Sequence, residues 1–266
     1  MDNQTGKKSI IGPIIVVVVM ILLGLLVGCN AKQCTFLNAL KGNPKGALHI
    51  GSLLSGTKIF IDNEKKTITE ASELPIIFKD LKAETHEILV GKDGYWPWIK
   101  KINLAPGTTT TVLPFMVQQN PIGQVIRTVD PEYKTYVTLI NQDKLPTSGT
   151  KKLSKDNKVS LFVENGAIKA EWVGEETIPY FFCNGECSDV QTVITPQSSI
   201  NSLDFYGDRN DVLIFSDQSG IYAIELDKRG TQNFQPVYSG KDIKFLKTQD
   251  GSFYLLDAGK LVHIIL

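Results

Sequence analysis

The chain has 266 residues, of which 42% are apolar and 21% charged, and its 28 basic residues balance its 28 acidic ones. This composition is typical of a globular protein with enough chain for one large or two modest domains, and the balanced charge argues against nucleic acid or an anionic membrane surface as the partner. Short runs of Val, Ile, Thr, Phe and Tyr alternate with Gly, Asn, Asp and Pro, which predicts a mainly β protein.

A long apolar stretch, residues 10–28, carries no charged side chain. As a helix rising ~1.5 Å per residue, it would cross the ~30 Å hydrocarbon core of a bilayer. We therefore predict a cytoplasmic tail at residues 1–9, a transmembrane anchor at residues 10–28 and a stalk at residues 29–46. In the alternative, the sequence LVGC ending at Cys29 resembles a bacterial lipobox, and Cys29 would be lipidated after cleavage. The uncleaved anchor is favoured, because secretory signals have apolar regions of only ~7–15 residues.

The orientation of this single-pass membrane protein is predicted from its cysteines. Basic residues lie on both sides of the anchor, so their distribution alone does not orient it. Cys183 and Cys187 enclose Asn-Gly-Glu, a sequence typical of a tight turn. A disulfide across so short a loop requires an oxidising compartment, which predicts that the chain after the anchor is extracytoplasmic. Two free thiols and half of a zinc site are the alternatives, although zinc needs four ligands and the three histidines are scattered singly.

Residues 47–118 contain short runs in which polar and apolar residues tend to alternate, as in strands with one buried face. Turn signals separate these runs, among them Asp62-Asn63 and Lys92-Asp93-Gly94. The predicted strands are residues 47–50, 57–61, 76–78, 86–90, 98–104 and 109–117.

This part of the chain resembles a PEGA domain. The resemblance rests on the order of residues 55–63, 74–75, 77–81, 86–90, 92–98 and 105–107, with Gly94, Tyr95 and Trp98 as its best part. It implies a small extracytoplasmic β-sandwich that acts as a spacer or adhesion unit. The chain departs from the family at Asn63, at Leu74 and at residues 83–84, where the family usually has Gly, Thr and Pro-Gly.

The aromatic residues Tyr95, Trp96 and Trp98 follow a glycine that can turn the chain. Tyr95 and Trp98 are spaced to pack beside one another, and a small sandwich needs its large apolar side chains in the core. Core packing is therefore the favoured interpretation. The alternative is a surface on which a sugar stacks.

Residues 121–266 are predicted to form a second all-β domain. It would begin with strands at residues 124–129 and 133–140 and an exposed loop at residues 142–157, and no long run with helical period is evident. Three hairpins follow, with turns at residues 164–166, 216–220 and 257–259. The hairpins recur at about the ~40–50-residue spacing of β-propeller blades, which predicts a propeller-like arrangement. A closed propeller needs at least ~4 blades, so closure of the sheet stays open.

The sequence lacks the motifs of a serine hydrolase, a zinc protease, a phosphate-binding loop and a Cys-x-x-Cys site. Several acidic residues lie in or beside turns, where side chains bond the local backbone. These residues are Asp62, Asp204, Asp208, Asp211 and Asp217. We predict a non-enzymatic envelope protein without cofactor or metal that presents a β-rich domain to an envelope protein or a cell-wall glycan. The alternatives are a surface glycan hydrolase using these carboxylates, a calcium loop at residues 204–211, or the lipoprotein-type ectodomain of a signalling complex.

Overall fold

The computed structural model describes residues 44–68 and 75–265. The predicted tail and anchor, and Cys29 with most of the stalk, lie outside these residues. The chain divides at residue 46, and residues 46–266 form one compact unit. This unit is mainly β, with several sheets, as the sequence predicts. Across the described ranges, no helix has both the length and the apolar character needed to cross a membrane.

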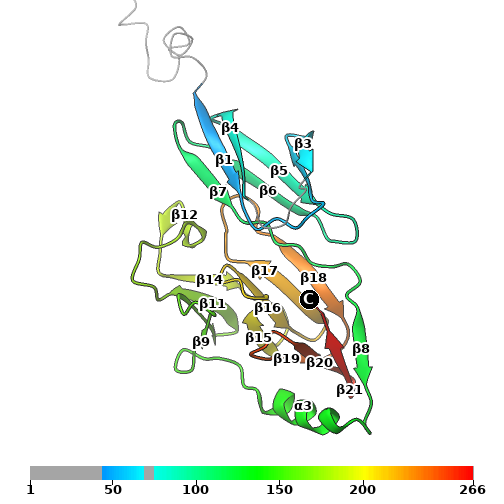
Figure 1. The fold of residues 1–266 in the computed structure, drawn as a ribbon. Helices are drawn as coiled ribbons and strands as arrows, with labels where there is room; N and C mark the ends of the chain where they lie inside the picture. The colour runs from blue at the N-terminus through cyan, green and yellow to red at the C-terminus, as the bar shows by residue number, and fades with distance from the viewer. Residues whose placement is uncertain (1–43, 69–74, 266) are drawn as a thin grey trace, which may run out of the picture. The chain divides into compact units, whose positions relative to one another are not determined.

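The N-terminal module, residues 46–112, consists of two sheets with strand orders β4-β1-β7 and β3-β2-β5-β6 (Figure 1). The strands are β1 (Lys45–Ile50), β2 (Lys58–Ile61), β3 (Glu64–Ile68), β4 (Ile76–Lys82), β5 (Thr85–Gly91), β6 (Trp98–Asn103) and β7 (Thr109–Val112). Alternate residues of β1, β2 and β5 face a shared core that includes Leu48, Ile50, Ile59 and Ile88. The two sheets therefore pack face to face, with one apolar side each.

The polar strand β3 was not predicted from the sequence. Its residues Glu64, Lys65 and Lys66 show no apolar alternation, because β3 is the edge strand of its sheet. The two-residue turn that connects it to β2 was predicted. Asp62 and Asn63 both have positive φ, at 52° and 66°, as a two-residue hairpin turn that follows the twist of its strands requires.

The C-terminal module, residues 119–265, contains three four-stranded antiparallel sheets (Figure 1). The first sheet has the order β14-β11-β10-β9, the second β15-β16-β17-β18 and the third β19-β20-β21-β8. The strands are β8 (Gly123–Ile126), β9 (Lys152–Leu153), β10 (Val159–Glu164), β11 (Ala167–Trp172), β14 (Val190–Ile194), β15 (Ser202–Phe205), β16 (Val212–Ser216), β17 (Gly220–Glu225), β18 (Phe234–Ser239), β19 (Lys244–Lys247), β20 (Phe253–Asp257) and β21 (Lys260–Ile264). A small hairpin of β12 (Cys183–Asn184) and β13 (Glu186–Cys187) follows the 3₁₀ turn η1 (Tyr180–Phe182).

The second sheet lies between the other two. All of β16 is buried, with Leu213 and Phe215 in a core shared with the first sheet. Val212 and Ile214 face the opposite way, into a core shared with the third sheet. That second core is continuous with the core of the N-terminal module, so the two modules share buried apolar surface.

The three predicted hairpins are confirmed as β10–β11, β16–β17 and β20–β21. The turn of the first is Asn165-Gly166, and both residues have positive φ, which glycine adopts without the steric cost that a Cβ would add. Strand β8 pairs with β21, so one sheet contains both the first and the last strand of the module.

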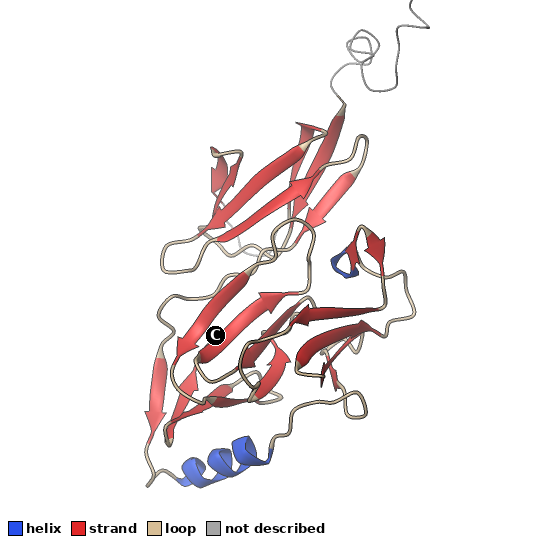
Figure 2. Cartoon of the chain, turned by 180° about the vertical axis from the view of Figure 1, so that it is seen from behind, coloured by secondary structure: helices blue, strands red, loops and turns tan. Residues whose placement is uncertain are grey.

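The prediction of a strand at residues 133–140 is wrong, because this segment lies in α3 (Pro131–Gln142). Pro131 is at the start of the helix, where its missing N–H costs nothing. Tyr133, Tyr136 and Ile140 follow at helical spacing and pack on the outer face of the third sheet (Figure 2). This spacing was the helical period that the sequence analysis missed. The predicted loop at residues 142–157 contains the short strand β9.

A buried histidine of β5, His86, bonds to the turn between β2 and β3 and to the end of β4. Nδ1 of His86 lies 2.6 Å from Oδ2 of Asp62, and Nε2 lies 2.9 Å from the carbonyl oxygen of Lys82. A carboxylate and a carbonyl only accept hydrogen bonds, so both contacts are hydrogen bonds only when both ring nitrogens carry a proton, and the site favours the charged imidazole. Burial lowers the pKa of His86, but the hydrogen bonds to Lys82 and Asp62 outweigh it and raise the pKa above its ordinary value. The pKa of Asp62 is lowered, because its bonds to His86 and to the N–H of Glu87 outweigh its burial.

The stability of the protein should therefore depend on pH through His86. A raised histidine pKa contributes stability that is complete below ~6.5 and is lost as the pH rises through the folded value. We expect the urea unfolding midpoint to fall as the pH rises above ~6.5, and this slope to be smaller in His86→Gln. His49→Gln, on β1, is the matched control and should keep the slope. Equal slopes in the wild type and His86→Gln would show that the ion pair does not stabilise the fold.

Candidate functional site

The junction between the two modules contains a fully buried lysine. Lys100 of β6 donates from Nζ to Oε1 of Glu225 on β17 at 2.7 Å, and to the carbonyl oxygens of Asp227 and Thr231 at 2.9 and 3.0 Å. Asn233 donates to the same Glu225 oxygen from its backbone N–H and its side-chain amide, at 2.7 and 2.9 Å. Burial raises the pKa of the Glu225 carboxyl, while Lys100 and Asn233 oppose this. The buried charges of the lysine from one module and the glutamate from the other thus compensate one another.

Strand β6 makes further contacts on both sides of this pair. Nε1 of Trp98 donates to Oε2 of Glu225 at 3.1 Å, and the N–H of Ile99 donates to Oδ1 of Asn233 at 3.0 Å. Gly230 has a φ of 63°, and a Cβ at this residue would lie 1.7 Å from the carbonyl oxygen of Lys101. Only glycine allows the loop after β17 to lie this close to β6.

Two arginines hold the chain that connects the modules. Arg209 pairs with Asp211 and donates from Nη1 and Nη2 to the carbonyl oxygens of Pro114 and Leu113, at 2.6 and 2.7 Å. Burial disfavours the charge on Arg209, but the neighbouring carboxylate of Asp211 outweighs this effect, and the pKa of Arg209 is raised.

Arg229, in the loop between β17 and β18, repeats this arrangement. It pairs with Asp227 at 2.9 Å and donates from Nη2 to the carbonyl oxygen of Thr111, at the end of β7, at 2.7 Å. Residues 114–117, the middle of the connection, are buried. The connection is therefore part of the packed interior and is held by charge-assisted hydrogen bonds to the C-terminal module.

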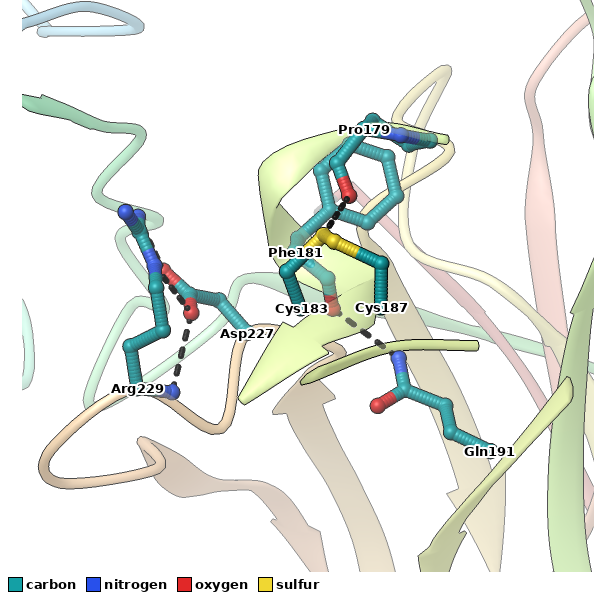
Figure 3. Close-up of a disulfide and its surroundings, with 7 residues drawn as sticks. All are labelled: Pro179, Phe181, Cys183, Cys187, Gln191, Asp227 and Arg229. Carbon is teal, nitrogen blue, oxygen red and sulfur yellow. Dashed lines mark hydrogen bonds and ion pairs between the residues drawn. A yellow bond between two sulfur atoms is a disulfide. The ribbon is translucent and has the colours of Figure 1, made fainter. Parts of the chain in front are cut away.

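The disulfide hairpin lies beside Arg229 (Figure 3). The sulfur atoms of Cys183 and Cys187, the residues predicted to pair, are bonded to one another. The Cys183 sulfur lies 3.5 Å from the carbonyl oxygen of Pro179. The amide of Gln191 donates to the carbonyl oxygens of Phe181 and Leu226, at 3.0 and 3.2 Å, and so fastens the turn before the disulfide to the loop after β17.

Tyr180 is the residue of this turn that reaches the junction. The guanidinium of Arg229 lies 4.3 Å from the centre of its ring, a cation–π contact. Its hydroxyl is buried, and it has no hydrogen-bond partner among the described residues. Burial, together with the nearby Asp211 and Asp227, raises the pKa of Tyr180 far above its usual value, so the phenol stays neutral.

A cleft of about 420 Å³ opens next to the junction, and we call it the junction cleft. Its walls come from four separate segments of the chain. They are residues 52–54, Tyr95, residues 114–116 with Gln118, and Tyr206-Gly207 with Arg209. The hydroxyl of Tyr206 donates to the carbonyl oxygen of Met116 at 3.2 Å, and the amide of Gln118 donates to the hydroxyl of Tyr95 at 3.3 Å. Burial and the nearby phenol of Tyr95 raise the pKa of Tyr206 to about 12.

The three predicted aromatic residues have different environments. Trp98 is completely buried at the junction and has no surface on which a ligand could stack. Tyr95 is partly buried and lines the junction cleft. Trp96 is 37% exposed and lines a separate hollow together with residues 119–121 and 236–239. The structure therefore does not bring the three into one stacking surface.

The acidic residues of the turns each have a partner of their own. Asp204 pairs with Lys152 at 2.6 Å and Asp208 with Lys155 at 2.6 Å. Asp217 accepts hydrogen bonds from Ser198 and Ser219, and its pKa is lowered because these bonds outweigh its burial. Among the residues that the structure describes, no group of three or more acidic, histidine or cysteine side chains could hold a metal ion.

Sequence reasoning missed most of the junction. Lys100 follows an apolar residue in a run that reads as an ordinary alternating strand, and its partner is far along the chain. A signal was present in residues 113–117, LPFMV, whose apolar character favours a buried connection over an exposed linker. The spacing Arg-x-Asp at Arg209 and Asp-x-Arg at Asp227 was a second signal, because both pairs lie at strand ends.

Comparison with known proteins adds little to this description. No family model matches the chain. No curated protein matches it. A crystal structure of a Bacteroides fragilis protein of unknown function, described as membrane-associated, is similar at 11% sequence identity and a TM-score of 0.21. The similarity covers 83% of this chain and 94% of that one, and at this TM-score it supports no inference about fold or function.

Removal of the Lys100 charge should destabilise the whole compact unit. Lys100→Met leaves the Glu225 carboxylate buried without its cation, at an expected cost of ~3–5 kcal/mol in unfolding free energy. Lys101→Met is the matched control, because the Lys101 side chain is 62% exposed and lies 3.5 Å from Glu87. We expect it to change stability by no more than ~0.5 kcal/mol. The double variant Lys100→Met/Glu225→Leu should recover part of the loss in urea denaturation, and a double variant no more stable than Lys100→Met would contradict this account.

Reduction of the disulfide should have a smaller effect, because the bond closes a loop of only five residues. The loop-entropy relation gives a loss of about 2 kcal/mol of unfolding free energy for a ring of this size. We expect a phosphine reductant to lower the urea midpoint of the wild type accordingly. Cys183→Ser/Cys187→Ser should have the lower midpoint from the start and should not respond to the reductant. A wild-type midpoint that is indifferent to reduction would mean that the hairpin is held by Gln191 and the core alone.

Proposed function

We propose that this chain is a non-enzymatic, membrane-anchored protein of the cell envelope that presents its two modules to an envelope protein or a cell-wall glycan outside the cytoplasm. The observation that carries the proposal is the buried Lys100–Glu225 junction, which fixes the N-terminal module on the C-terminal module and so sets the walls of an open cleft. A preformed cleft costs little ordering entropy when a ligand binds, which suits a binding protein.

Two further features support a location outside the cytoplasm. Residues 10–28 form an uncharged apolar stretch of the length of a membrane-spanning helix. The Cys183–Cys187 disulfide is of a kind that persists in oxidising compartments and is rare in the cytosol. In the described residues, the carboxylates that a glycan hydrolase would use bond to lysines, serines, Arg209 and His86, and this favours binding over hydrolysis.

The sheet arrangement of each module also fits the proposal. The two face-to-face sheets of residues 46–112 support a PEGA-like β-sandwich that serves as a spacer between membrane and partner. The three successive four-stranded sheets support a propeller-like C-terminal module, in which β8 and β21 join its two ends. Three sheets are fewer than the ~4 blades of a closed propeller, so we propose an open, blade-like stack.

Thiol labelling of cells that express the full chain tests the location. A membrane-impermeant thiol reagent should label Cys183 and Cys187 in intact cells, and only after reduction. Cys183→Ser/Cys187→Ser, read by mass spectrometry of the same peptide, should give no signal there. Labelling that needs permeabilisation but no reduction would place the modules in the cytoplasm.

The immobilised full chain in detergent should also retain a protein or glycan from envelope fractions, and retention of neither would contradict the binding role.

A further inference from the structure

We propose that the junction cleft binds an uncharged saccharide, with Tyr95, Tyr206 and Gln118 as its contact residues. The inference rests on the proposed function and names the ligand class and the site. Its basis is a combination of three properties of the cleft walls: they carry no unpaired charge, they expose aromatic rings, and they hold hydrogen-bonding groups that are only partly used.

The charged groups that line the cleft favour a neutral ligand over an ionic one. Among the residues that line it, Arg209 alone is charged, and its guanidinium is already bonded to Asp211 and to two carbonyl oxygens. Among the lining residues an anion would therefore find no free cation to offset the loss of its water. Nζ of Lys92, outside the lining, lies 5.0 Å from the centre of the Tyr95 ring. A cation would find no carboxylate among these residues. A neutral ligand avoids both costs.

The aromatic rings supply the surface on which a sugar ring can pack. Tyr95 and Tyr206 are the partly exposed rings of the cleft, and Tyr206 packs edge-on against the buried ring of Phe115, with ring centres 6.2 Å apart. Tyrosine combines an apolar ring with a polar hydroxyl at low entropic cost, which suits a ligand that has C–H faces and O–H edges. Leu53 and Met116 extend the apolar part of the wall.

The polar groups leave capacity for a second partner. The amide of Gln118 uses its nitrogen on Tyr95, and this bond leaves its carbonyl oxygen as an acceptor. The Tyr95 hydroxyl accepts that bond and still has a proton to donate. The Tyr206 hydroxyl donates to Met116 and can still accept. The cleft thus offers an acceptor, a donor and a second acceptor beside aromatic rings, and its volume falls in the ~300–1,000 Å³ range of small-molecule sites.

The test uses the full chain in detergent with two neutral probes, chitotetraose and cellotetraose, and tetragalacturonate as a charged probe. Saturation-transfer NMR should show contact of at least one neutral probe with the protein through its ring C–H protons, and isothermal titration should give its affinity. Tyr95→Leu should weaken this binding roughly tenfold, since an aromatic contact contributes up to ~1.5 kcal/mol beyond its buried area. Gln118→Ala should weaken it as well. Urea midpoints of both variants establish that they fold.

Trp96→Leu is the matched control, because Trp96 is adjacent in sequence but lines a different hollow. It should bind the neutral probe as the wild type does. The inference would be overturned if Trp96→Leu lost binding of the neutral probe while Tyr95→Leu kept it. It would also be overturned if the wild type bound tetragalacturonate as tightly as the neutral probes. Absence of binding by both neutral probes at millimolar concentration would overturn it as well. In these cases, a chain that is labelled outside the cell and retains an envelope partner would keep its proposed function without this ligand.

Discussion

The structure depends on two charges that are buried together between the modules. Transfer of a lysine or a glutamate out of water costs several kcal/mol for each ion, and only mutual pairing with further hydrogen bonds offsets the cost. Lys100 and Glu225 meet this condition with Asn233, Trp98 and two carbonyl oxygens around them. Neither module can leave the other without exposing or orphaning one of these groups. The N-terminal and C-terminal sheets are thus parts of one folding unit, in agreement with their shared apolar core.

This constraint explains the character of the connecting chain. A linker between independent domains is usually polar and mobile, whereas residues 114–117 are buried. The carbonyl oxygens of Thr111, Leu113 and Pro114 accept hydrogen bonds from two arginines. Each of these arginines uses part of its guanidinium on a local aspartate and the rest on the backbone of the connection. The local pair fixes the direction of the side chain, and the remaining N–H groups then reach a defined point. The walls of the junction cleft are positioned by the same bonds.

The hairpins could be predicted from local sequence signals, whereas the junction between the modules could not. Asn165-Gly166 forms the turn that its residue types require, because positive φ is a property of those two residues. The α3 segment was predicted as a strand because six of residues 133–140 have β propensity, while the decisive features were Pro131 and the spacing of Tyr133, Tyr136 and Ile140. Strand β3 was missed because an edge strand needs no apolar face.

The cleft could not be predicted for a different reason. Its walls come from loops and a connection that are remote in sequence, and no repeated spacing links Ser52, Tyr95, Gln118 and Tyr206. The buried ion pair of Lys100 and Glu225 brings these residues together, and the sequence does not show that these two charges are buried. Lys100 and Lys101 are adjacent and identical in type, yet one is completely buried against Glu225 and the other is mostly exposed. Since a strand alternates its faces, the burial of Trp98 implies that Lys100 also points inward. An inward lysine in a packed protein requires a buried acid, and in this chain that acid is Glu225, the last residue of β17. The burial of Lys100 therefore points to the junction between the modules.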